Sequence, residues 1–216
     1  MSHLMRQEVP RNWPIKRKGS TYVVKPNFNI NKGIPVLIIL RDLLKLAQTR
    51  KEAKKIIHLR QVLVNERKIK DEKNNVLLFD TINVIPLNKC YRLELSEKGK
   101  FYLKEINKTE TEKKISKIIN KKSLRGKKIQ LNLSDGRNSL SEVKCNINDS
   151  VLINLKEGKI EKCLPLKEKA EVIVFAGKHS GKKGVINKLN LKDKTAEIKI
   201  EDREINILIN QLMVIE

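Results

Sequence analysis

Residues 36–64 read VLIILRDLLKLAQTRKEAKKIIHLRQVLV, and this stretch decides the fold of the first half of the chain. Apolar residues recur at steps of three and four over residues 36–47, which is the period of a helix with one buried side. Gln48 breaks that pattern. Thr49 and Glu52 then have the spacing of a capping box, in which each side chain satisfies a backbone N–H at the start of a helix. The stretch therefore predicts two consecutive helices.

The second helix is expected to run to about Leu59 and to have two different sides. Ala53, Ile56 and Ile57 form the side that packs inward. The other side collects Arg50, Lys51, Lys54 and Lys55, with Arg60 just beyond the helix. Glu52 is the acid close by in sequence, whereas a solvated helix face usually mixes both signs. We interpret this basic face as a surface for a polyanion.

Beyond the second helix the hydrophobic period changes to two, which is typical of strands. The expected strands are residues 62–64, 76–79, 82–85, 91–95, 101–106, 129–133, 151–155, 171–175, 196–200 and 205–209. The pair at 91–95 and 101–106 has the pattern of a hairpin. Residues 71–75 are expected to form a loop, and residues 109–114 a short basic helix or turn. Short strands punctuated by Gly turns indicate small all-β modules.

The composition points to a nucleic-acid partner. The 216 residues include 47 Lys and Arg against 25 Asp and Glu, which gives a net charge of +22 and a pI near 9.9. A surface of like charges repels itself unless a polyanion neutralises it. An anionic membrane is the other candidate, but it requires an amphipathic basic helix with large apolar anchors or a lipidation signal. The sequence has neither.

Simple counts argue against secretion, membrane spanning and metal binding. No apolar run exceeds five residues, as at 36–40, and the N-terminus lacks the apolar core of a signal peptide. The three cysteines (Cys90, Cys145 and Cys163) and the three histidines are scattered and lack metal-ligand spacing. We therefore expect a cytoplasmic protein with reduced thiols, no metal site and no cofactor.

Residues 1–35 are predicted to form an extended basic arm without regular elements, because four of the six prolines lie there. Trp13 and Tyr22 lie among basic residues. These basic residues are Arg6, Arg11, Lys16, Arg17 and Lys18. Aromatic and basic side chains on an extended segment suit the grooves of folded RNA. The segment has few apolar residues for a core, so we expect it to be mobile alone and ordered on RNA.

Three glycines within eight residues, Gly177, Gly181 and Gly184, punctuate the last segment. A phosphate-binding loop would need G-x-x-x-x-G-K-[ST] followed by a helix, whereas Lys183 follows Gly181-Lys182 here and a strand pattern comes next. We expect a structural turn in which the glycines set the backbone conformation. That turn presents Lys178, His179, Lys182 and Lys183.

The order of these parts resembles one protein family. Residues 39–44, 49–57 and 62–65, with Asp80-Thr81-Ile82, resemble the α-plus-β RNA-binding module named after bacterial ribosomal protein S four. Residues 177–186 look like a KOW motif. The segments His3-Leu4, Arg6 and 10–18 are similar to the N-terminus of the e-type ribosomal protein S four family of archaea and eukaryotes, which carries both modules in this order. Residues 129–138 and 148–160 look like its central β domain.

The resemblance implies an α+β, multi-domain fold. The domains are expected at 1–35 (extended N-terminal arm), 36–90 (α-plus-β RNA-binding module), 91–168 (central all-β domain) and 169–216 (KOW-type, SH3-like β-barrel). Modules of the second kind often have Gly where Arg60 and Glu66 stand here, and the second of these sites normally forms a tight turn. Eukaryotic members usually continue beyond the last strand, so an ending at Glu216 favours an archaeal type.

The resemblance also implies the function, that of a structural, non-catalytic constituent of the small ribosomal subunit without a small-molecule substrate. The expected partners are small-subunit rRNA and neighbouring ribosomal proteins. RNA contacts are expected from the basic residues of the arm, the second helix and the glycine turn, from Trp13, and from Arg41 and Lys45. Arg41, Arg50 and Arg60 are weighted above nearby lysines because a guanidinium can bridge phosphates.

Two other classes stay open. An RNA-modifying enzyme of the pseudouridine synthase kind carries a similar module, but it needs a catalytic domain with a carboxylate in a pocket. The segment between the two modules is short for that, and Asp135 lies in a turn predicted to be exposed. A transcription or translation factor would use the KOW-like barrel for protein contacts, and residues 169–216, with nine basic and seven acidic residues, are close to neutral. In moderate salt a factor would wash off small subunits, whereas a ribosomal protein would stay.

Overall fold

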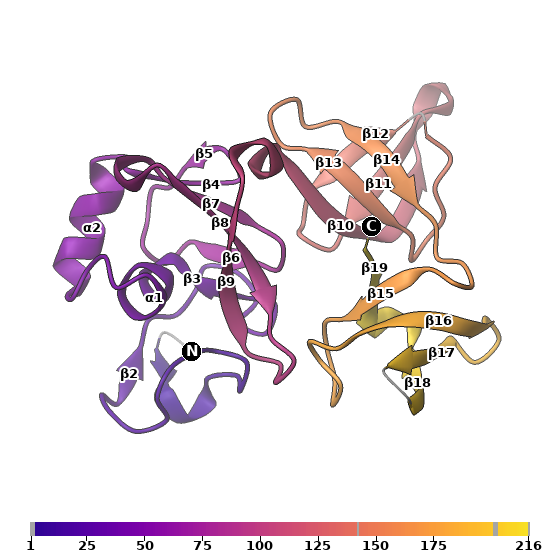
Figure 1. The fold of residues 1–216 in the computed structure, drawn as a ribbon. Helices are drawn as coiled ribbons and strands as arrows, with labels where there is room; N and C mark the ends of the chain where they lie inside the picture. The colour runs from indigo at the N-terminus through magenta and orange to yellow at the C-terminus, as the bar shows by residue number, and fades with distance from the viewer. Residues whose placement is uncertain (1–2, 142, 201–202, 216) are drawn as a thin grey trace. The chain divides into compact units, whose positions relative to one another are not determined.

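The computed structural model describes residues 3–141, 143–200 and 203–215, and the chain divides into two compact units (Figure 1). The first unit comprises Met1–Leu95 with Lys100–Glu112, and the second comprises Ser96–Gly99 with Lys113–Glu216. Strands predominate and helices are few, which agrees with the α+β class expected from the sequence. Among the described residues, no helix is long and apolar enough to cross a membrane.

The first unit contains a small helical layer and a five-stranded antiparallel sheet in the order β5-β4-β7-β8-β9. Its helices are η1 (Arg6–Glu8), α1 (Val36–Ile38), η2 (Ile39–Leu43), α2 (Arg50–His58), η3 (Ile85–Leu87) and η4 (Lys108–Glu112). Its strands are β1 (Leu4–Met5), β2 (Tyr22–Val23), β3 (Gly33–Pro35), β4 (Val62–Val64), β5 (Arg67–Lys68), β6 (Asn75–Leu77), β7 (Thr81–Val84), β8 (Lys89–Leu95) and β9 (Phe101–Ile106). Two further pairs, β1-β2 and β3-β6, complete it.

The first predicted helix is shorter than its apolar pattern suggested. α1 continues directly into η2, a π-helical turn in which the Leu44 N–H donates to the Ile39 carbonyl at 2.8 Å. Lys45 then takes the left-handed conformation, with φ of 55°, and ends the helix. Residues 36–40 are all buried, so this segment is covered on every side rather than along one stripe.

The second predicted helix forms as expected. Thr49 is the N-cap of α2, and its hydroxyl accepts the Glu52 N–H at 3.3 Å. The Glu52 carboxylate returns to accept the Gln48 N–H at 2.8 Å. The Thr49 half of the capping box is confirmed, whereas the Glu52 carboxylate binds the N–H of Gln48, one residue before the N-cap, and the Thr49 hydroxyl at 2.9 Å.

A tight turn joins β4 to β5 even though it lacks glycine. Leu63 pairs with Lys68 and Val64 with Arg67, which leaves Asn65 and Glu66 as the two turn residues. Both have positive φ, 51° and 60°, as a two-residue hairpin of type I′ requires. Asn tolerates this conformation, but for Glu it costs about 1 kcal/mol or more.

Replacing Glu66 by glycine is therefore expected to stabilise the first unit by about 0.5–1 kcal/mol, since glycine removes the steric cost and loses only some chain entropy. Urea unfolding measures this change in the free energy of unfolding. Glu66→Ala is the matched control, because it removes the same side chain but keeps a Cβ at positive φ. Equal stabilities of the two variants would show that the turn is not strained at this residue.

The hairpin that follows the boundary expected between residues 90 and 91 is grouped in the structure with the strands before it. β8 pairs with β7 from Thr81–Arg92 to Val84–Lys89, and β9 pairs with β8, so the hairpin extends the sheet of the first unit. The second unit begins at Lys113 instead. A hairpin pattern identifies two paired strands, but it carries no information about the sheet that they join.

The N-terminal arm is packed rather than extended away from the unit, which corrects the sequence expectation. Leu4, Val9 and Trp13 are buried, and the Trp13 indole N–H donates to the Ile30 carbonyl at 3.2 Å. The Phe101 N–H donates to the Asn12 carbonyl at 2.9 Å, which ties the arm to β9. A few well-placed apolar residues anchor this segment although its average composition is polar.

The second unit is built from two five-stranded antiparallel sheets, in the orders β12-β11-β10-β13-β14 and β18-β17-β16-β15-β19. The strands of the first of these sheets are β10 (Lys113–Ser123), β11 (Ile129–Leu133), β12 (Asn138–Ser141), β13 (Ser150–Asn154) and β14 (Ile160–Leu164). Those of the other are β15 (Glu171–Val174), β16 (Lys183–Asn190), β17 (Thr195–Ile200), β18 (Arg203–Leu208) and β19 (Leu212–Val214). The turns η5 (Arg125–Lys127) and η6 (Ile209–Gln211) complete the unit. Its longest strand, β10, was not predicted, because its basic sequence hides the alternation.

Two contacts join the sheets of the second unit. The Lys117 ammonium, buried, donates to the Leu212 carbonyl at 2.8 Å and to the Ile209 carbonyl. The Val214 N–H donates to the Ser150 hydroxyl at 3.0 Å. Burial lowers the pKa of Lys117 to about 8, and the two carbonyl oxygens supply the polar partners that a buried ammonium needs.

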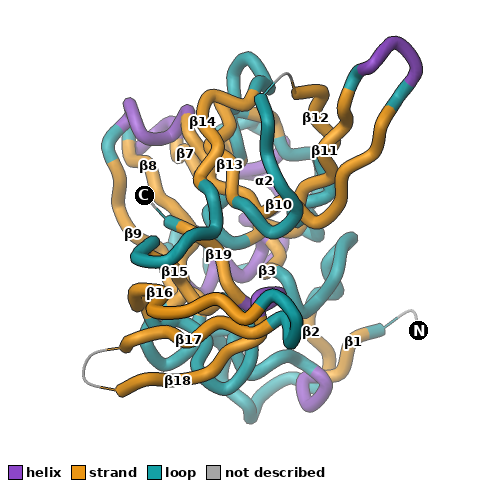
Figure 2. The backbone as a smooth tube through the Cα atoms, turned by 90° about the vertical axis from the view of Figure 1, so that its right-hand side faces the viewer, coloured by secondary structure: helices purple, strands orange, loops and turns teal. Residues whose placement is uncertain are grey.

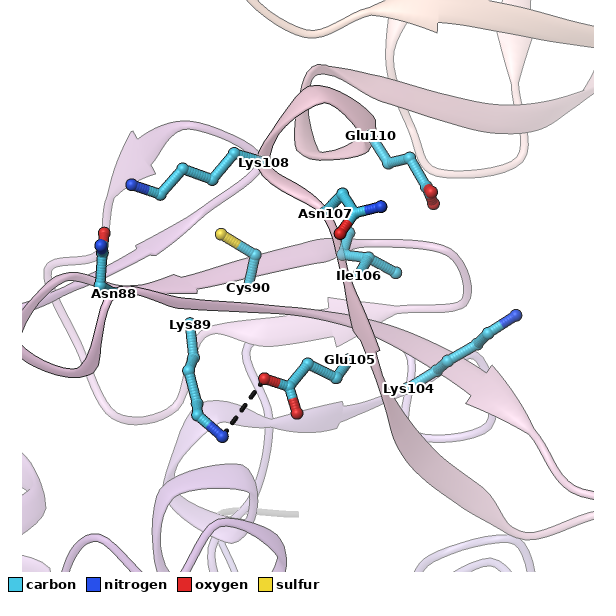
Figure 3. Close-up of a pocket in the computed structure, with 9 residues that line it drawn as sticks. All are labelled: Asn88, Lys89, Cys90, Lys104, Glu105, Ile106, Asn107, Lys108 and Glu110. Carbon is cyan, nitrogen blue, oxygen red and sulfur yellow. Dashed lines mark ion pairs between the residues drawn. The ribbon is translucent and has the colours of Figure 1, made fainter.

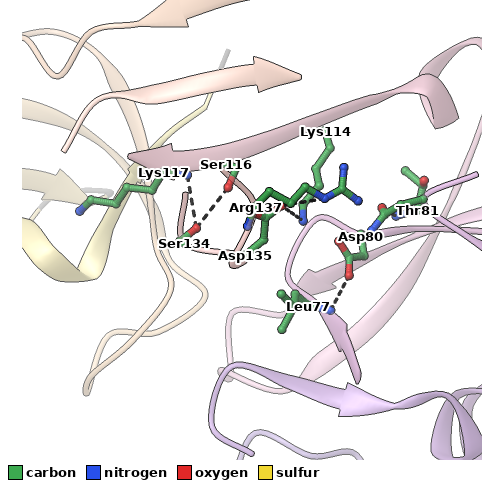
Figure 4. A network of polar contacts seen from close by, with 10 residues as sticks. Leu77, Asp80, Thr81, Lys114, Ser116, Lys117, Ser134, Asp135 and Arg137 are labelled. Atoms are coloured by element: carbon green, nitrogen blue, oxygen red, sulfur yellow. Dashed lines mark hydrogen bonds and ion pairs between the residues drawn. The ribbon is translucent and has the colours of Figure 1, made fainter. Parts of the chain in front are cut away.

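A buried ion pair lies within this unit (Figure 4). The Lys114 ammonium contacts the Asp135 carboxylate at 2.8 Å, and both side chains are 4% exposed or less. Arg137 approaches the same carboxylate at 3.5 Å. Burial acts to raise the pKa of Asp135, but the charge and hydrogen bond of Lys114 outweigh it and lower that pKa. The prediction that Asp135 is exposed is thus wrong for its side chain.

The glycine-rich segment is the loop between β15 and β16, and a strand follows it rather than the helix that a phosphate-binding loop needs. Gly181 has a φ of +92°. A Cβ at Gly184 would lie 2.5 Å from the Lys199 carbonyl oxygen on the neighbouring strand β17. Backbone conformation at Gly181 and close strand packing at Gly184 therefore both favour glycine.

Candidate nucleic-acid interface

The basic side of α2 divides into two rows. Arg50 and Lys54 turn toward the loop before β6, where both contact the Glu72 carboxylate. Lys51 and Lys55, one turn apart, are exposed and make no ion pair with any described residue. Ala53 and Ile57, on the inward side, are buried. The charge that remains unneutralised on α2 is therefore carried mainly by Lys51 and Lys55.

Glu72 explains this division, and sequence analysis missed it. Its carboxylate is 4% exposed and accepts the Arg50 Nε–H at 3.0 Å, with the Lys54 ammonium at 3.6 Å. Burial acts to raise the pKa of Glu72, but the hydrogen bonds and positive charge of Arg50 favour the carboxylate, and the pKa is lowered to about 2. An uncompensated carboxylate at this position would be costly, so Arg50 serves the fold as well as the surface.

From the sequence, the arginines of this region rank above nearby lysines as RNA contacts, but two of the three arginines form ion pairs with acidic residues. Arg41 lies beside Asp42, with nitrogen and oxygen 2.9 Å apart. Arg50 is held by Glu72. Arg60 is exposed and has a φ of 56°, which closes the C-terminal end of α2. Lys45 is exposed where the first helix ends.

The basic residues of the arm also separate into structural and exposed ones. The Arg6 guanidinium donates to the Ser20 carbonyl at 2.7 Å and to the Lys16 carbonyl at 2.8 Å, so it closes the arm on itself. Arg17 donates to the Val9 carbonyl at 3.1 Å. Arg11, Lys16 and Lys18 are exposed.

Of the three aromatic residues Trp13, Tyr22 and Phe28 in the arm, two are exposed and one is buried. Trp13 is 2% exposed, so its indole is not available to stack on a base, and its place among the RNA-contact residues is a wrong prediction. Tyr22, by contrast, is 58% exposed and lies 5.5 Å from the His3 ring, centroid to centroid. Phe28 is 46% exposed, so the exposed aromatic surface of the arm is provided by Tyr22 and Phe28.

The loop between β15 and β16 presents its cations unevenly. Lys178 and Lys183 are exposed, whereas His179 and Lys182 are half-buried. Gly177 lies within this loop and has a φ of +90°.

Exposed basic residues also occur where no sequence prediction placed them. Arg67 and Lys68 lie on β5, an edge strand of the first sheet. Lys122, Arg125 and Lys128 lie at the end of the β10–β11 hairpin. The acid-free run KKSLRGKK at 121–128 was the available signal for the second group.

A depression of about 480 Å³ lies on the first unit beside the edge strand β9 (Figure 3). Lys89 and Glu105 form an ion pair at 3.2 Å at this depression, and Lys104 and Lys108 also line it. Burial raises the pKa of the Cys90 thiol there, which disfavours the nucleophilic thiolate. No group of three or more His, Cys, Asp or Glu that could hold a metal occurs among the described residues.

Exposed basic side chains on a helix, a loop and a hairpin of an α+β scaffold are the features expected of a protein that binds polyanions. Comparisons with known proteins agree. Residues 38–82 match the S4 domain, and residues 87–160 match ribosomal family S4e. The chain is 40% identical over 193 residues to small ribosomal subunit protein eS4 of Methanocella arvoryzae, covering 88% of this chain and 82% of that one. It is 39% identical over 191 residues to the eS4 protein of Nanoarchaeum equitans, covering 87% and 82%.

The fold agrees with these similarities. The crystal structure of the 30S ribosomal protein S4e from Thermoplasma acidophilum superposes with a TM-score of 0.73 at 23% identity, covering 85% of this chain and 95% of that one. The chain belongs to the eS4 family of small ribosomal subunit proteins, a structural rather than an enzymatic family. The family resemblance stated from the sequence is confirmed, and the RNA-modifying enzyme is excluded.

Proposed function

We propose that this chain acts in the cytoplasm as a structural constituent of the small ribosomal subunit and binds rRNA through the Lys51 and Lys55 row of α2, extended by Arg60. The observation that carries the proposal is the asymmetry of α2. Its inward side is committed to packing, and its Arg50 and Lys54 row contacts Glu72, but the Lys51 and Lys55 row makes no ion pair with any described residue. The S4 domain match covers this helix.

The binding mechanism follows from charge and shape. Each ammonium that contacts an RNA phosphate releases condensed counterions, so affinity falls as the salt concentration rises. Double-helical RNA hides its base edges in a deep, narrow groove, and a lysine row therefore recognises the backbone rather than the sequence. Arg11, Lys16, Lys18 and Tyr22 of the arm would add contacts to the same partner from the first unit.

We further propose that residues 169–216 form a KOW-type, SH3-like module. Five short antiparallel strands, with the glycine loop between the first two, support this reading. Lys178 in that loop and Lys183 at the start of β16 would face rRNA, whereas the near-neutral remainder suits contacts with neighbouring ribosomal proteins. Stoichiometric co-sedimentation with small subunits in moderate salt separates this role from that of a factor that washes off.

Replacing both Lys51 and Lys55 by glutamine is expected to weaken rRNA binding and to flatten the slope of log affinity against log salt by about 1.5–2 units. Glutamine keeps the helix propensity of α2 nearly level, so the free energy of unfolding should change little. Filter binding to an archaeal small-subunit rRNA transcript at several salt concentrations measures the effect.

Lys167→Gln with Lys192→Gln is the matched control, since it removes two exposed positive charges from positions without a proposed role. Arg50→Gln with Lys54→Gln is a poor test, because it leaves Glu72 buried without its partners. An unchanged salt slope for the Lys51 and Lys55 variant, with wild-type binding intact, would move the rRNA surface elsewhere on the chain.

A further inference from the structure

The β10–β11 hairpin leaves the core of its own sheet. β10 pairs with β13 only from Lys113 to Lys117, and beyond Ile118 it pairs only with β11. All of its residues from Ile119 to Ser123 are exposed. Successive side chains of a strand point to opposite faces, so exposure of consecutive residues means that neither face is covered. The hairpin ends in η5, the purple turn at the upper right of Figure 2.

The charge on this hairpin has one sign. No acidic residue occurs between Lys113 and Ser134. Lys121 bends back to donate to the Cys145 carbonyl at 3.0 Å, so it serves the fold. Lys122, Arg125 and Lys128 are exposed and make no ion pair with any described residue.

Apolar side chains accompany these cations. A register shift between Ile118 and Asn120 leaves Ile119 without a cross-strand partner, and its side chain is 51% exposed. Leu124, beside the tip, and Leu140, on β12, are exposed as well. Lysines alone could be explained by their known role on edge strands, where they prevent pairing with strands of other chains. That role does not call for exposed Ile119 and Leu124 on the same segment.

The tip is shaped by its backbone. Gly126 has a φ of +78°, and a Cβ added there would meet nothing within 4 Å, so this glycine serves the turn and not packing. The Leu124 N–H donates to the Lys128 carbonyl at 2.8 Å and closes the turn. Lys122, Arg125 and Lys128 are thus presented on a preformed ribbon, which loses less entropy on binding than a disordered basic tail.

From this charge and shape we propose that the tip of the β10–β11 hairpin, residues 119–128, is a second RNA-docking element, independent of α2. It contacts the phosphate backbone through Lys122, Arg125 and Lys128, while Ile119 and Leu124 pack on sugars or unstacked bases. The inference rests on the proposed rRNA-binding function, and it assigns to the second unit a contact that the α2 surface does not provide.

The test uses the full chain with Lys122, Arg125 and Lys128 all replaced by glutamine. With an archaeal small-subunit rRNA transcript, the slope of log affinity against log salt should flatten by about 2–3 units. Since the salt dependences converge near 1 M salt, the loss of affinity at 0.1 M should be about a hundredfold to a thousandfold. The control replaces Lys167, Lys192 and Lys199 by glutamine and should change the slope by less than about half a unit. A cleavage reagent tethered at Ser123→Cys should cut rRNA locally.

Each outcome decides between the two proposals. An unchanged slope in the tip variant, with wild-type rRNA binding intact, overturns the docking element and leaves the α2 proposal standing. If the tip variant binds rRNA normally but fails to join small subunits, the tip contacts a protein, and the RNA-docking proposal is overturned. Failure of the wild-type chain to bind rRNA overturns both proposals.

Discussion

Replacing Lys114 by methionine is expected to lower the free energy of unfolding of the second unit by about 3–5 kcal/mol, among the largest effects of any single substitution in the chain. Lys114 and Asp135 are almost completely buried, with ammonium and carboxylate 2.8 Å apart. Removal of the cation leaves a buried carboxylate that keeps Arg137 as a partner at 3.5 Å. Urea unfolding followed by circular dichroism measures the loss as a lower midpoint with an unchanged slope.

The double variant Lys114→Met with Asp135→Leu serves as the control. Removal of both charges also removes the cost of burying either one alone, so much of the lost stability should return. A double variant as unstable as the single one would show that packing around Lys114, and not the loss of the ammonium from the buried carboxylate, causes the lower stability.

Replacing Trp13 by alanine is expected to cost about 3–5 kcal/mol in the first unit in the absence of RNA. The indole is 2% exposed and donates to the Ile30 carbonyl, so the truncation leaves a cavity and an unpaired carbonyl. If the arm were mobile in the free protein, the same substitution would barely change the free energy of unfolding.

Tyr22→Ala is the matched control for an aromatic residue of the same arm. Because Tyr22 is 58% exposed, this truncation should change the free energy of unfolding by about 0.5 kcal/mol or less. Native-state amide exchange gives a second measurement, since the Arg6 N–H donates to the Thr21 carbonyl at 2.9 Å and should be protected without RNA. Fast amide exchange at Arg6, together with an unchanged free energy of unfolding for Trp13→Ala, would show that the arm is mobile in the free protein.

Some conclusions about function could be drawn from short stretches of the sequence alone. The family, its non-catalytic character and the basic face of α2 all follow from patterns within short stretches, such as the capping box at Thr49 and Glu52. The loop between β15 and β16 could likewise be distinguished from a phosphate-binding loop by two local features. Lys183 stands where that motif needs Ser or Thr, and a strand pattern follows instead of a helix. Local chemistry is enough for such conclusions, because the interacting groups are neighbours in the chain.

The sequence by itself determined helix α2 and its cap, the β8–β9 hairpin and the overall excess of positive charge, because each depends on residues a few positions apart. Only the tertiary structure decided which cations are free for RNA. Glu72 reaches Arg50 across 22 residues, and Asp135 reaches Lys114 across 21. Trp13 likewise finds its acceptor at Ile30 across 17 residues. Such pairings depend on the path of the intervening chain, and a local pattern of charge or hydrophobicity carries no record of that path.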